Sequence, residues 1–361
     1  MENFSSLEQV YDNIKTFLNS SDSVRISLIY ACNTTGKTRL SRYFEEEYQE
    51  EGTLCYNAFL EDCFSWDNDN YTFNICNCWE LKLINDEGLD KKIETNFQQF
   101  TNSSIEVDFN TKTGNIAFQI RDNEGKKVNI KISKGEESLF IWTIFYTILS
   151  RAIDLLTEKQ EDRSTEIFDK LKYIVIDDPV SSMDDTRIIT VGLAISELLE
   201  KAETSDKLKT KLGILITTHH TLFFNILHSR NNKKRKDYVL SRIDETYILK
   251  PQPKASPFAY HHEIIQEIQN AIKEDKLKKY HFNMFRCLLE KTANYLGYED
   301  NWSVLIPEED TRDLLAKTIN QYSHSQLSET ESPIVEENDK ELFENSFSSF
   351  IENCKWNYKV D

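Results

Sequence analysis

The sequence predicts two fold classes in one chain, an α/β domain over residues 1–255 and an all-α domain over residues 256–361. In the first part, apolar runs of strand length are followed by polar residues of the kinds that bind phosphate and metal. The second part shows helical periodicity and little else. The only proline cluster, at residues 250–257, lies between the two parts and is typical of a domain boundary.

The first functional segment is the loop at residues 31–38, with the sequence ACNTTGKT. It follows an apolar run at residues 24–30 that predicts a buried strand, and a helix is expected to begin near Lys37. Because backbone N–H groups at such a helix start bind anions, this is the context of a phosphate-binding loop. We expect Lys37 to contact the β- and γ-phosphates and the hydroxyl of Thr38 to ligate Mg²⁺. The further nucleotide-binding candidates are Asn33, Thr35, Gly36 and Arg39.

Two later apolar runs also lead into candidate site residues. Residues 173–176 precede Asp177 and Asp178, and residues 212–217 lead towards His219. A carboxylate at a strand end is a suitable Mg²⁺ ligand, so we expect Asp177 to hold the metal. Each of these three segments also has a simpler explanation by itself. The loop at residues 31–38 could be an ordinary turn, the two aspartates an acidic end of a strand, and His219 a structural histidine. Their order and spacing favour one nucleotide site.

A fourth segment, residues 132–138 with the sequence ISKGEES, leads into a strongly helical run at residues 136–157. Ser133 and Glu136 fit a capping box at the start of that helix. The segment also resembles the signature of ABC-type ATPases, and the four segments in this order resemble the nucleotide machinery of that family. The predicted fold of the first part is therefore an α/β ABC-type ATPase with a P-loop and a mixed sheet.

The resemblance to ABC-type ATPases implies further roles. Asp178 takes the place of the carboxylate that activates the attacking water, and His219 that of the histidine that contacts the γ-phosphate. Ser133, Gly135 and Glu136 belong to the segment that binds the nucleotide held by an opposite subunit. One chain alone would not build a complete site, so a homodimer or a higher oligomer is expected.

Composition narrows the class of protein. The net charge of −18 argues against broad, non-specific nucleic-acid binding, although a local basic site stays possible. Seven scattered cysteines are typical of reduced thiols rather than of a disulfide framework. No apolar run reaches the length of a membrane span, and the first residues lack the features of a signal peptide. We therefore expect a cytoplasmic protein without membrane contact. The basic cluster at residues 233–236 is interpreted as a solvated loop.

The other elements of the first part are predicted from local patterns. We expect an amphipathic helix within residues 1–20, a strand at 53–58 and a strand at 247–250. Alternating residues and two turns predict a small antiparallel meander at 105–132. The stretch at 61–92, rich in Asn, Asp and aromatic residues, is interpreted as an irregular insertion.

In the second part, Arg286 and Glu290 lie four residues apart on one predicted helix and therefore on one face. His324 ends the next long helix. A surface ion pair is the simpler explanation of the first two residues, but apolar residues interleave with them, which indicates that they border packed surface. Two packed helices could bring the three side chains together. The predicted helices cover residues 260–274, 276–296, 309–322 and 339–354.

These three groups suit metal-free cleavage of RNA. An RNA supplies its own nucleophile, the 2′-hydroxyl, and a histidine can carry its proton near neutral pH. An arginine can brace the negative phosphorane with two hydrogen bonds. A glutamate can orient the arginine or assist the base.

With these residues placed, the chain resembles PrrC-type anticodon nucleases over nearly its whole length. Members join an N-terminal ABC ATPase to a C-terminal helical ribonuclease domain of the HEPN type. The family's catalytic Arg, Glu and His fall on Arg286, Glu290 and His324, and no metal is implied in the nuclease site. The segments that carry the resemblance are residues 30–31, 35–42, 56–59, 61–62, 66–69, 133–138, 176–182, 280–282, 290–293 and 323–325.

The resemblance implies cleavage of tRNA(Lys) 5′ to the wobble base, leaving a 2′,3′-cyclic phosphate and a 5′-hydroxyl. It also implies a latent anti-phage toxin that a type I restriction–modification complex holds inactive. Mg²⁺ with ATP or GTP would drive activation, and dTTP would stabilise the active form. Pro253 and Lys254 fall in the family's substrate-reading segment, which lacks the usual acidic residue here and leaves the tRNA identity open.

Two other readings of the chain stay open at this point. One is an ABC ATPase of the DNA-repair or anti-phage kind whose helical tail binds a separate effector. The other is a nucleotide-dependent structural dimer without catalysis in its tail. Only the nuclease reading requires the three residues of the second part to converge.

Overall fold

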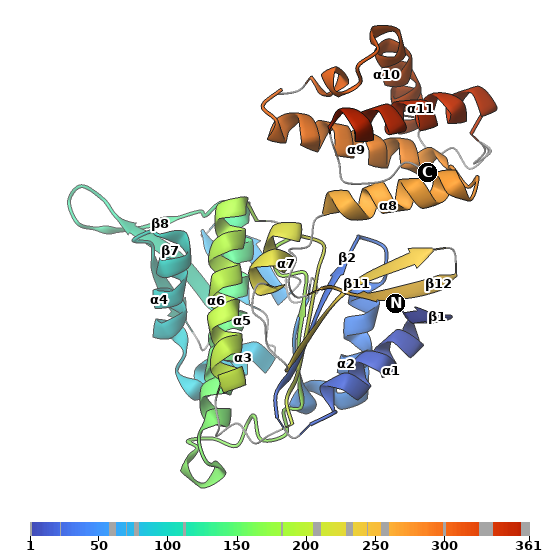
Figure 1. Cartoon of the computed structure of the whole chain (residues 1–361). Helices are drawn as coiled ribbons and strands as arrows, with labels where there is room; N and C mark the ends of the chain where they lie inside the picture. The colour runs from blue at the N-terminus through green and yellow to red at the C-terminus, as the bar shows by residue number, and fades with distance from the viewer. Residues whose placement is uncertain are drawn as a thin grey trace. The chain divides into compact units, whose positions relative to one another are not determined.

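The chain forms two compact units, residues 1–258 and 259–361 (Figure 1). Each is described by itself below. The computed structural model describes residues 2–21, 23–57, 63–69, 71–75, 79–110, 113–181, 183–204, 211–228, 234–243, 245–253, 260–298, 301–324 and 335–354.

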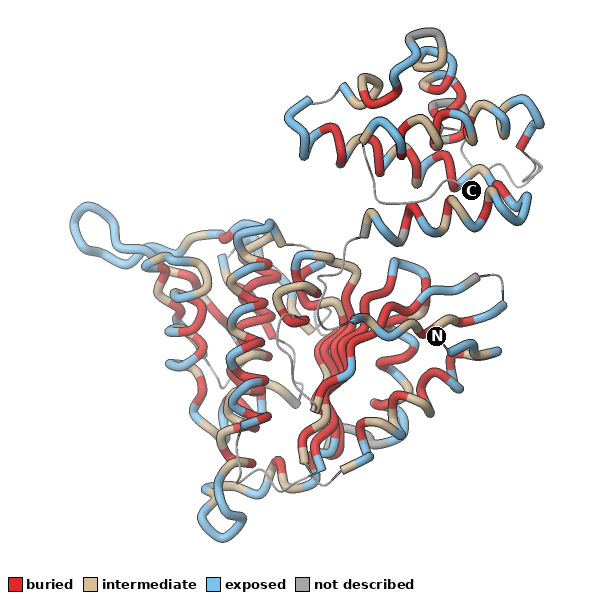
Figure 2. Tube along the Cα trace, viewed as in Figure 1, coloured by how far each residue is buried: buried red, intermediate tan, exposed pale blue. Residues whose placement is uncertain are grey.

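Unit 1 is built on a seven-stranded mixed sheet in the order β1-β12-β11-β2-β10-β9-β3. The five strands from β11 to β3 run parallel, and β12 and β1 are added antiparallel at one edge. Apolar side chains fill the central strands, which Figure 2 shows as a buried block. This confirms the predicted α/β class. The strands are β1 (Glu2–Phe4), β2 (Arg25–Ala31), β3 (Thr53–Tyr56), β9 (Tyr173–Asp177), β10 (Gly213–Thr218), β11 (Arg235–Ile243) and β12 (Thr246–Pro251).

Helices cover both faces of this sheet (Figure 1). Ile29 of β2 packs with the apolar faces of α1 and α2, whereas the ring of Tyr30 contacts Phe224 of α7 at 6.0 Å between centroids. Successive strand residues point to opposite faces, so α7 lies across the sheet from α1 and α2. The helices of this part are α1 (Leu7–Leu18), α2 (Lys37–Gly52), α5 (Lys134–Thr157), α6 (Asp185–Thr204) and α7 (Thr221–His228), with a short 3₁₀ turn η2 (Gln160–Asp162).

Helix α5 is long and apolar enough to span a membrane, which differs from the expectation that no run reaches that length. In its most apolar window, 78% of the residues are buried inside the structure. Trp142 and Phe145 pack against Tyr56 of β3, for example. The apolar character of α5 is therefore that of a core helix in unit 1.

A second sheet of five strands belongs to unit 1, with the path β4-β5-β7-β6 and β8 paired to β7. Its strands β6 to β8 confirm the predicted meander. The interpretation of residues 61–92 as irregular is wrong for their described part, because two strands, one helix and the start of another helix form there. Phe64 and Trp66 stack on Phe73 and Phe118, an alternation that the polar neighbours obscured. The elements are β4 (Phe64–Asp67), β5 (Thr72–Ile75), β6 (Glu106–Asn110), β7 (Asn115–Arg121), β8 (Lys127–Ile130), α3 (Trp79–Glu87) and α4 (Asp90–Thr101).

Strand β11 corrects the interpretation of the basic cluster at residues 233–236. Arg235 is only 3% exposed and begins β11, which pairs in parallel with β2. Its guanidinium donates to the backbone oxygen of Leu227 at the end of α7, at 2.6 Å. A cation at the carboxyl end of a helix is electrostatically favourable, and that contact explains a buried arginine in a basic run.

Among the residues of unit 2 that the structure describes, all regular elements are helices, as predicted. Helix α9 contacts α8 and α10, and α10 contacts α11. Phenylalanines from α9 and α11 make the centre of its core, with Phe282 and Phe285 packed on Phe343. The elements are α8 (Tyr260–Lys273), α9 (Lys279–Tyr295), the 3₁₀ turn η3 (Trp302–Leu305), α10 (Glu309–His324) and α11 (Glu337–Asn353).

Candidate functional sites

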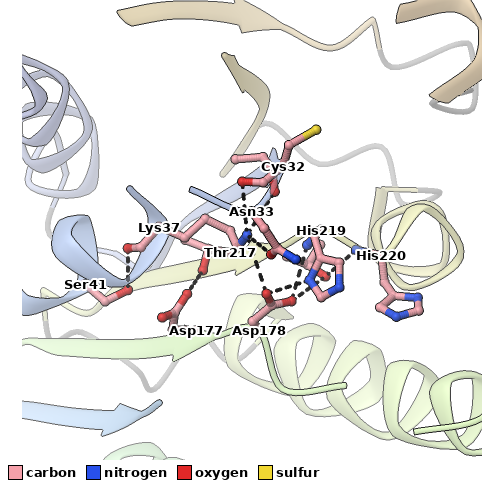
Figure 3. A network of polar contacts seen from close by, with 11 residues as sticks. Cys32, Asn33, Lys37, Ser41, Asp177, Asp178, Thr217, His219 and His220 are labelled. Atoms are coloured by element: carbon pink, nitrogen blue, oxygen red, sulfur yellow. Dashed lines mark hydrogen bonds and ion pairs between the residues drawn. The ribbon is translucent and has the colours of Figure 1, made fainter. Parts of the chain in front are cut away.

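The loop between β2 and α2 places Lys37 at the carboxyl edge of the main sheet (Figure 3). Its ammonium group donates to the backbone oxygens of Ala31 at 3.0 Å and Cys32 at 3.3 Å, and to Oδ1 of Asn33 at 3.2 Å. Only 7% of the Lys37 side chain is exposed. Three oxygens of the loop thus surround the ammonium group, which lies where a phosphate-binding loop is expected to hold its lysine.

The loop needs its glycine. Gly36 has φ of 107°, a region that residues with a Cβ rarely adopt, and a Cβ there would lie 3.0 Å from Leu7 of α1. Thr34 also has a positive φ, of 69°. Among the other predicted nucleotide-binding residues, Thr35 is buried in the loop and Arg39 is exposed on α2.

Asp177, at the end of β9, is 4% exposed and accepts hydrogen bonds from Thr217 of β10 and from Thr38 of α2. Thr217 is its direct neighbour in the parallel ladder. Burial raises the pKa of Asp177 above its ordinary value of 3.8, and the two hydroxyl hydrogen bonds offset only part of this effect. The structure thus brings Asp177 and Thr38 together, as the prediction of a shared metal ion requires.

These two residues fit a Mg²⁺ ion by the chemistry of their donors. A carboxylate and a hydroxyl are hard oxygen ligands, and protein sites for Mg²⁺ with a nucleotide use one or two carboxylates beside phosphate oxygens. The described residues contain no cluster of three or more His, Cys, Asp or Glu side chains that could hold a metal by itself. Asp177 and Thr38 would hold the ion together with phosphate oxygens of a nucleotide, and the charge of the ion would offset the cost of burying Asp177.

Asp178 lies between Lys37 and His219. Its carboxylate is 3.5 Å from the ammonium nitrogen of Lys37 and 2.6 Å from Nδ1 of His219, and it also accepts the backbone N–H of His219 at 3.2 Å. Burial acts to raise the pKa of Asp178, but the hydrogen bond from His219 and the charge of Lys37 outweigh it and hold the pKa below its ordinary value. Asp178 is thus an ionised carboxylate at neutral pH.

The backbone of Asp178 is in the left-handed region, with φ of 53°. Its N–H donates to the backbone oxygen of Thr217 at 2.9 Å, which ties this strained turn to the neighbouring strand. Thr218 supports the same corner, because its hydroxyl accepts the N–H of His220 at 3.0 Å. Sequence reasoning missed both threonines of β10, since the hydrogen bonds that they donate to Asp177 and Asp178 depend on the strand order.

The segment before α5 forms the predicted capping box. Ser133 Oγ accepts the N–H of Glu136 at 3.3 Å, and the Glu136 carboxylate accepts the N–H of Ser133 at 2.7 Å. Gly135 lies beside the guanidinium of Arg187, since a Cβ there would be 2.4 Å from its terminal nitrogen. Arg187, on α6, therefore adds positive charge beside the start of α5, and no motif in the sequence pointed to it.

In unit 2, α9 brings Arg286 and Glu290 together. Nε of Arg286 donates to Oε1 of Glu290 at 2.7 Å, and the side chains are 31% and 40% exposed. The neighbouring face of α9 is buried, with Phe282, Phe285, Leu289 and Ala293 inaccessible, whereas Leu296 is half-exposed. The pair therefore borders packed surface and still reaches solvent.

The third predicted nuclease residue, His324, is the last residue of α10, which packs against α9. Its side chain lies outside the described residues, so its convergence with the pair stays a prediction. In unit 1, Pro253 follows β12, and its backbone oxygen lies 3.1 Å from Nε2 of His228. Lys254, the other residue of the predicted substrate-reading segment, lies outside the described residues.

Comparison with known proteins shows which family the chain belongs to. The chain is 38% identical over 335 residues to a protein of Escherichia coli named "Anticodon nuclease", and the alignment covers 84% of this chain and 83% of that protein. Residues 80–350 match the family described as AAA domain.

Solved structures with detectable similarity include heads of SMC proteins. An SMC head bound to the C-terminal winged-helix domain of ScpA is 10% identical, covers 65% of this chain and 92% of its own, and has a TM-score of 0.35. The SMC head domain from Thermotoga maritima is 12% identical over 64% of this chain and 91% of its own, with a TM-score of 0.32. Both TM-scores are low, and the assignment depends on the sequence relationship: the chain belongs to the anticodon nuclease family and carries an AAA-type ATPase domain.

Proposed function

We propose that this chain is a nucleotide-gated endoribonuclease that cuts the anticodon loop of a tRNA, with a HEPN-type active site in unit 2. The observation that carries the proposal is the partly exposed Arg286–Glu290 pair on α9, in a chain whose relative bears the name anticodon nuclease. A solvent-reaching arginine with an orienting carboxylate is what a phosphate-cleaving site without metal requires.

The chemistry follows from the three side chains. The 2′-hydroxyl of the RNA transfers its proton to the imidazole of His324 and attacks the adjacent phosphorus. The bond from phosphorus to the 5′-oxygen breaks, and that oxygen takes up a proton. The products are a 2′,3′-cyclic phosphate and a 5′-hydroxyl. Arg286 stabilises the charge on the phosphorane, and Glu290 fixes the orientation of Arg286 through the 2.7 Å hydrogen bond.

In unit 1, the proposed role of the nucleotide site is to gate this reaction by hydrolysing ATP or GTP with Mg²⁺. Bound Mg²⁺ would neutralise charge on the phosphates beside Thr38 and Asp177. Lys37 would exchange its contacts with loop oxygens for phosphate oxygens, and Asp178 would orient and deprotonate the attacking water. His219, held by Asp178 through Nδ1, keeps Nε2 as the ring atom for a γ-phosphate. A stabilising effect of dTTP belongs to the same proposal.

We propose a homodimer as the smallest active form, because Ser133, Gly135 and Glu136 would complete the partner's nucleotide site. Two inactive variants test this: Lys37→Ala blocks one half of a composite site and Ser133→Arg the other. Mixing them should restore about one working site per dimer. Full hydrolysis by a proven monomer would exclude the composite site.

For the substrate, we propose a tRNA cut 5′ to its wobble base, with tRNA(Lys) as the first candidate. In the cell, this activity would make the chain a latent anti-phage toxin, held inactive in a type I restriction–modification complex. These assignments come from the resemblance to the family. Pro253 and Lys254 stand where the family usually has an acidic residue, so the tRNA that this chain cuts can differ from tRNA(Lys).

The deciding experiment maps tRNA ends after expression of the chain in bacteria, with wild type beside His324→Ala. We expect cleaved anticodon loops only with wild type, and purified enzyme should continue to cut in excess EDTA once it is active. A tRNA with a 2′-deoxy sugar at the cut site should resist cleavage. If it is cut, the 2′-hydroxyl mechanism is wrong. If neither chain cuts RNA but both hydrolyse ATP, the alternative of an ATPase with an effector-binding tail gains support.

A further inference from the structure

Helix α7 connects the nucleotide site with the end of unit 1. It begins at Thr221, two residues after His219, and ends at His228. Its eight residues span roughly 12 Å at the usual rise of an α-helix. His219, which is bound to Asp178, is thus joined to His228 by a single short helix.

The carboxyl end of α7 is fixed by two residues of β11. Arg235 donates to the backbone oxygen of Leu227, and Oδ2 of Asp237 lies 2.6 Å from Nδ1 of His228. Arg235 and Asp237 are two residues apart on a strand and therefore share one face. The side chains of His228 and Asp237 are 3% and 4% exposed. We call these contacts, with the one to Pro253, the α7 latch.

The protonation of the latch follows from its acceptors. The second nitrogen of His228, Nε2, lies 3.1 Å from the backbone oxygen of Pro253. A carbonyl oxygen only accepts, so Nε2 carries a proton. A second proton lies between Nδ1 and Asp237, because an ionised carboxylate would repel a bare nitrogen at 2.6 Å. The buried pair therefore has no net charge and makes two directed hydrogen bonds at once.

Pro253 occupies a defined place in the chain. The preceding residue, Gln252, donates its N–H to the backbone oxygen of Asp237 at 2.9 Å, which continues the pairing of β12 with β11. Pro253 is the last described residue of unit 1, and α8 of unit 2 begins at Tyr260. It also belongs to the segment proposed above to contact the tRNA. The latch thus holds the start of that segment.

We propose that His228 is a positioning residue of the nuclease reaction. Through its hydrogen bond to Pro253, it fixes the start of the RNA-contacting segment, and through α7 it ties that segment to His219 at the nucleotide site. This inference rests on the proposed function and adds the physical link between nucleotide state and RNA cleavage.

A pair of substitutions separates the two hydrogen bonds of His228. In His228→Gln, the side-chain amide nitrogen can take the place of Nε2 and keep the donor to Pro253. In His228→Asn, the shorter amide takes the place of Nδ1 and cannot reach Pro253. Both variants are tested in the full chain for ATP hydrolysis, for tRNA cleavage with ATP, and for hydrogen–deuterium exchange of residues 246–253 with and without ATP.

The expected result is a split between the two activities. His228→Asn should lower tRNA cleavage by roughly 3- to 10-fold, the cost of losing one hydrogen bond at the partly buried contact with Pro253, and should exchange faster over residues 246–253. ATP hydrolysis should change by less than about twofold, because the nucleotide site itself is intact. His228→Gln should restore cleavage and slow exchange.

Three outcomes decide the matter. If the wild-type chain hydrolyses ATP but cuts no RNA, the proposed function fails, and the exchange measurement still tests the latch. If exchange and cleavage are unchanged in His228→Asn, the inference is wrong. If both variants lose hydrolysis and thermal stability together, His228 acts in folding of unit 1, and the positioning role is excluded.

Discussion

The nucleotide site and the nuclease pair differ in how their geometry is produced. In unit 1, Lys37, Asp177 and Asp178 are nearly buried, and each depends on a side chain or carbonyl from another strand or helix. In unit 2, Arg286 and Glu290 are about one-third exposed and meet because they lie four residues apart on one helix.

The two sites also differ in how much they destabilise the folded state. Burying Asp177 raises its pKa, so the ionised form that a metal needs is held at the expense of stability. The Arg286–Glu290 pair keeps its contact with water and carries no comparable penalty. Substitutions should therefore affect stability in unit 1 and only activity in unit 2, and four experiments test that contrast.

The largest effect is expected from Glu290→Gln and Arg286→Ala. Each should lower tRNA cleavage by roughly 10²–10⁴-fold, because the phosphorane loses its stabilising charge or that charge loses its orientation. The matched control is Glu337→Gln, which breaks a similar ion pair with Lys340, 3.3 Å long, on α11 of the same unit. Cleavage rates and thermal unfolding are measured together. A control variant that loses as much cleavage would show that general surface charge, and not this pair, is required.

In unit 1, Lys37→Ala should reduce ATP hydrolysis by roughly 10²–10³-fold, the loss seen when one charge-stabilising donor is removed from a closed site. Lys15→Ala is the control, since Lys15 pairs with Glu47 on the surface of α1 and α2. Phosphate release is the measurement. Normal hydrolysis by the Lys37→Ala chain would remove this loop from the nucleotide site.

Asp177→Asn should have opposite effects on function and stability. It should abolish Mg²⁺-dependent nucleotide binding and raise the thermal unfolding midpoint of the nucleotide-free chain by roughly a few degrees. Since the folded pKa is raised, the contribution of Asp177 to stability is complete below its unfolded pKa and is lost as pH rises through the folded value. The stability difference between the variant and wild type should therefore develop as pH rises through the folded pKa of Asp177, and should stay constant above it. A less stable variant at neutral pH would contradict the burial argument.

The smallest effect is expected for Ser133→Ala at the capping box of α5. Loss of such a cap costs about 1 kcal/mol of stability. Ser6→Ala is the matched control, because Ser6 caps α1 by accepting the N–H of Gln9 at 3.3 Å. Denaturant unfolding should show similar losses for both, while only Ser133→Ala should lower ATP hydrolysis. Equal hydrolysis in the two variants would leave Ser133 with a capping role alone.

The sequence-based predictions succeeded where the interactions are between residues close together in the sequence. Periodicity and apolar length are local signals. They predicted the strand runs at residues 173–176 and 212–217, and also the helix that carries Arg286 and Glu290. The capping box of Ser133 and Glu136 is local as well. The strands β4 and β5 were missed because their aromatic residues alternate with Ser, Asp, Thr and Asn, and polar residues of these kinds are typical of loops.

The sequence did not predict the contacts of three residues, Arg235, Arg187 and His228. A basic run gave no sign that Arg235 enters a parallel strand, because that depends on pairing with β2, about two hundred residues earlier in the chain. Arg187 lies beside Gly135 only because α5 and α6 pack together. His228 gained its partners from β11 and from Pro253.

By itself, the sequence determined which residue types stand at strand ends and helix starts, and hence the α/β class, the helical second part and the family resemblance. Only the tertiary structure decided the order of the strands, which sets Asp177 beside Thr217 and Asp178 beside His219. The physical reason is that apolar pattern and capping act over a few residues, whereas the pKa and contacts of a buried side chain depend on neighbours that parallel strand pairing brings from distant segments.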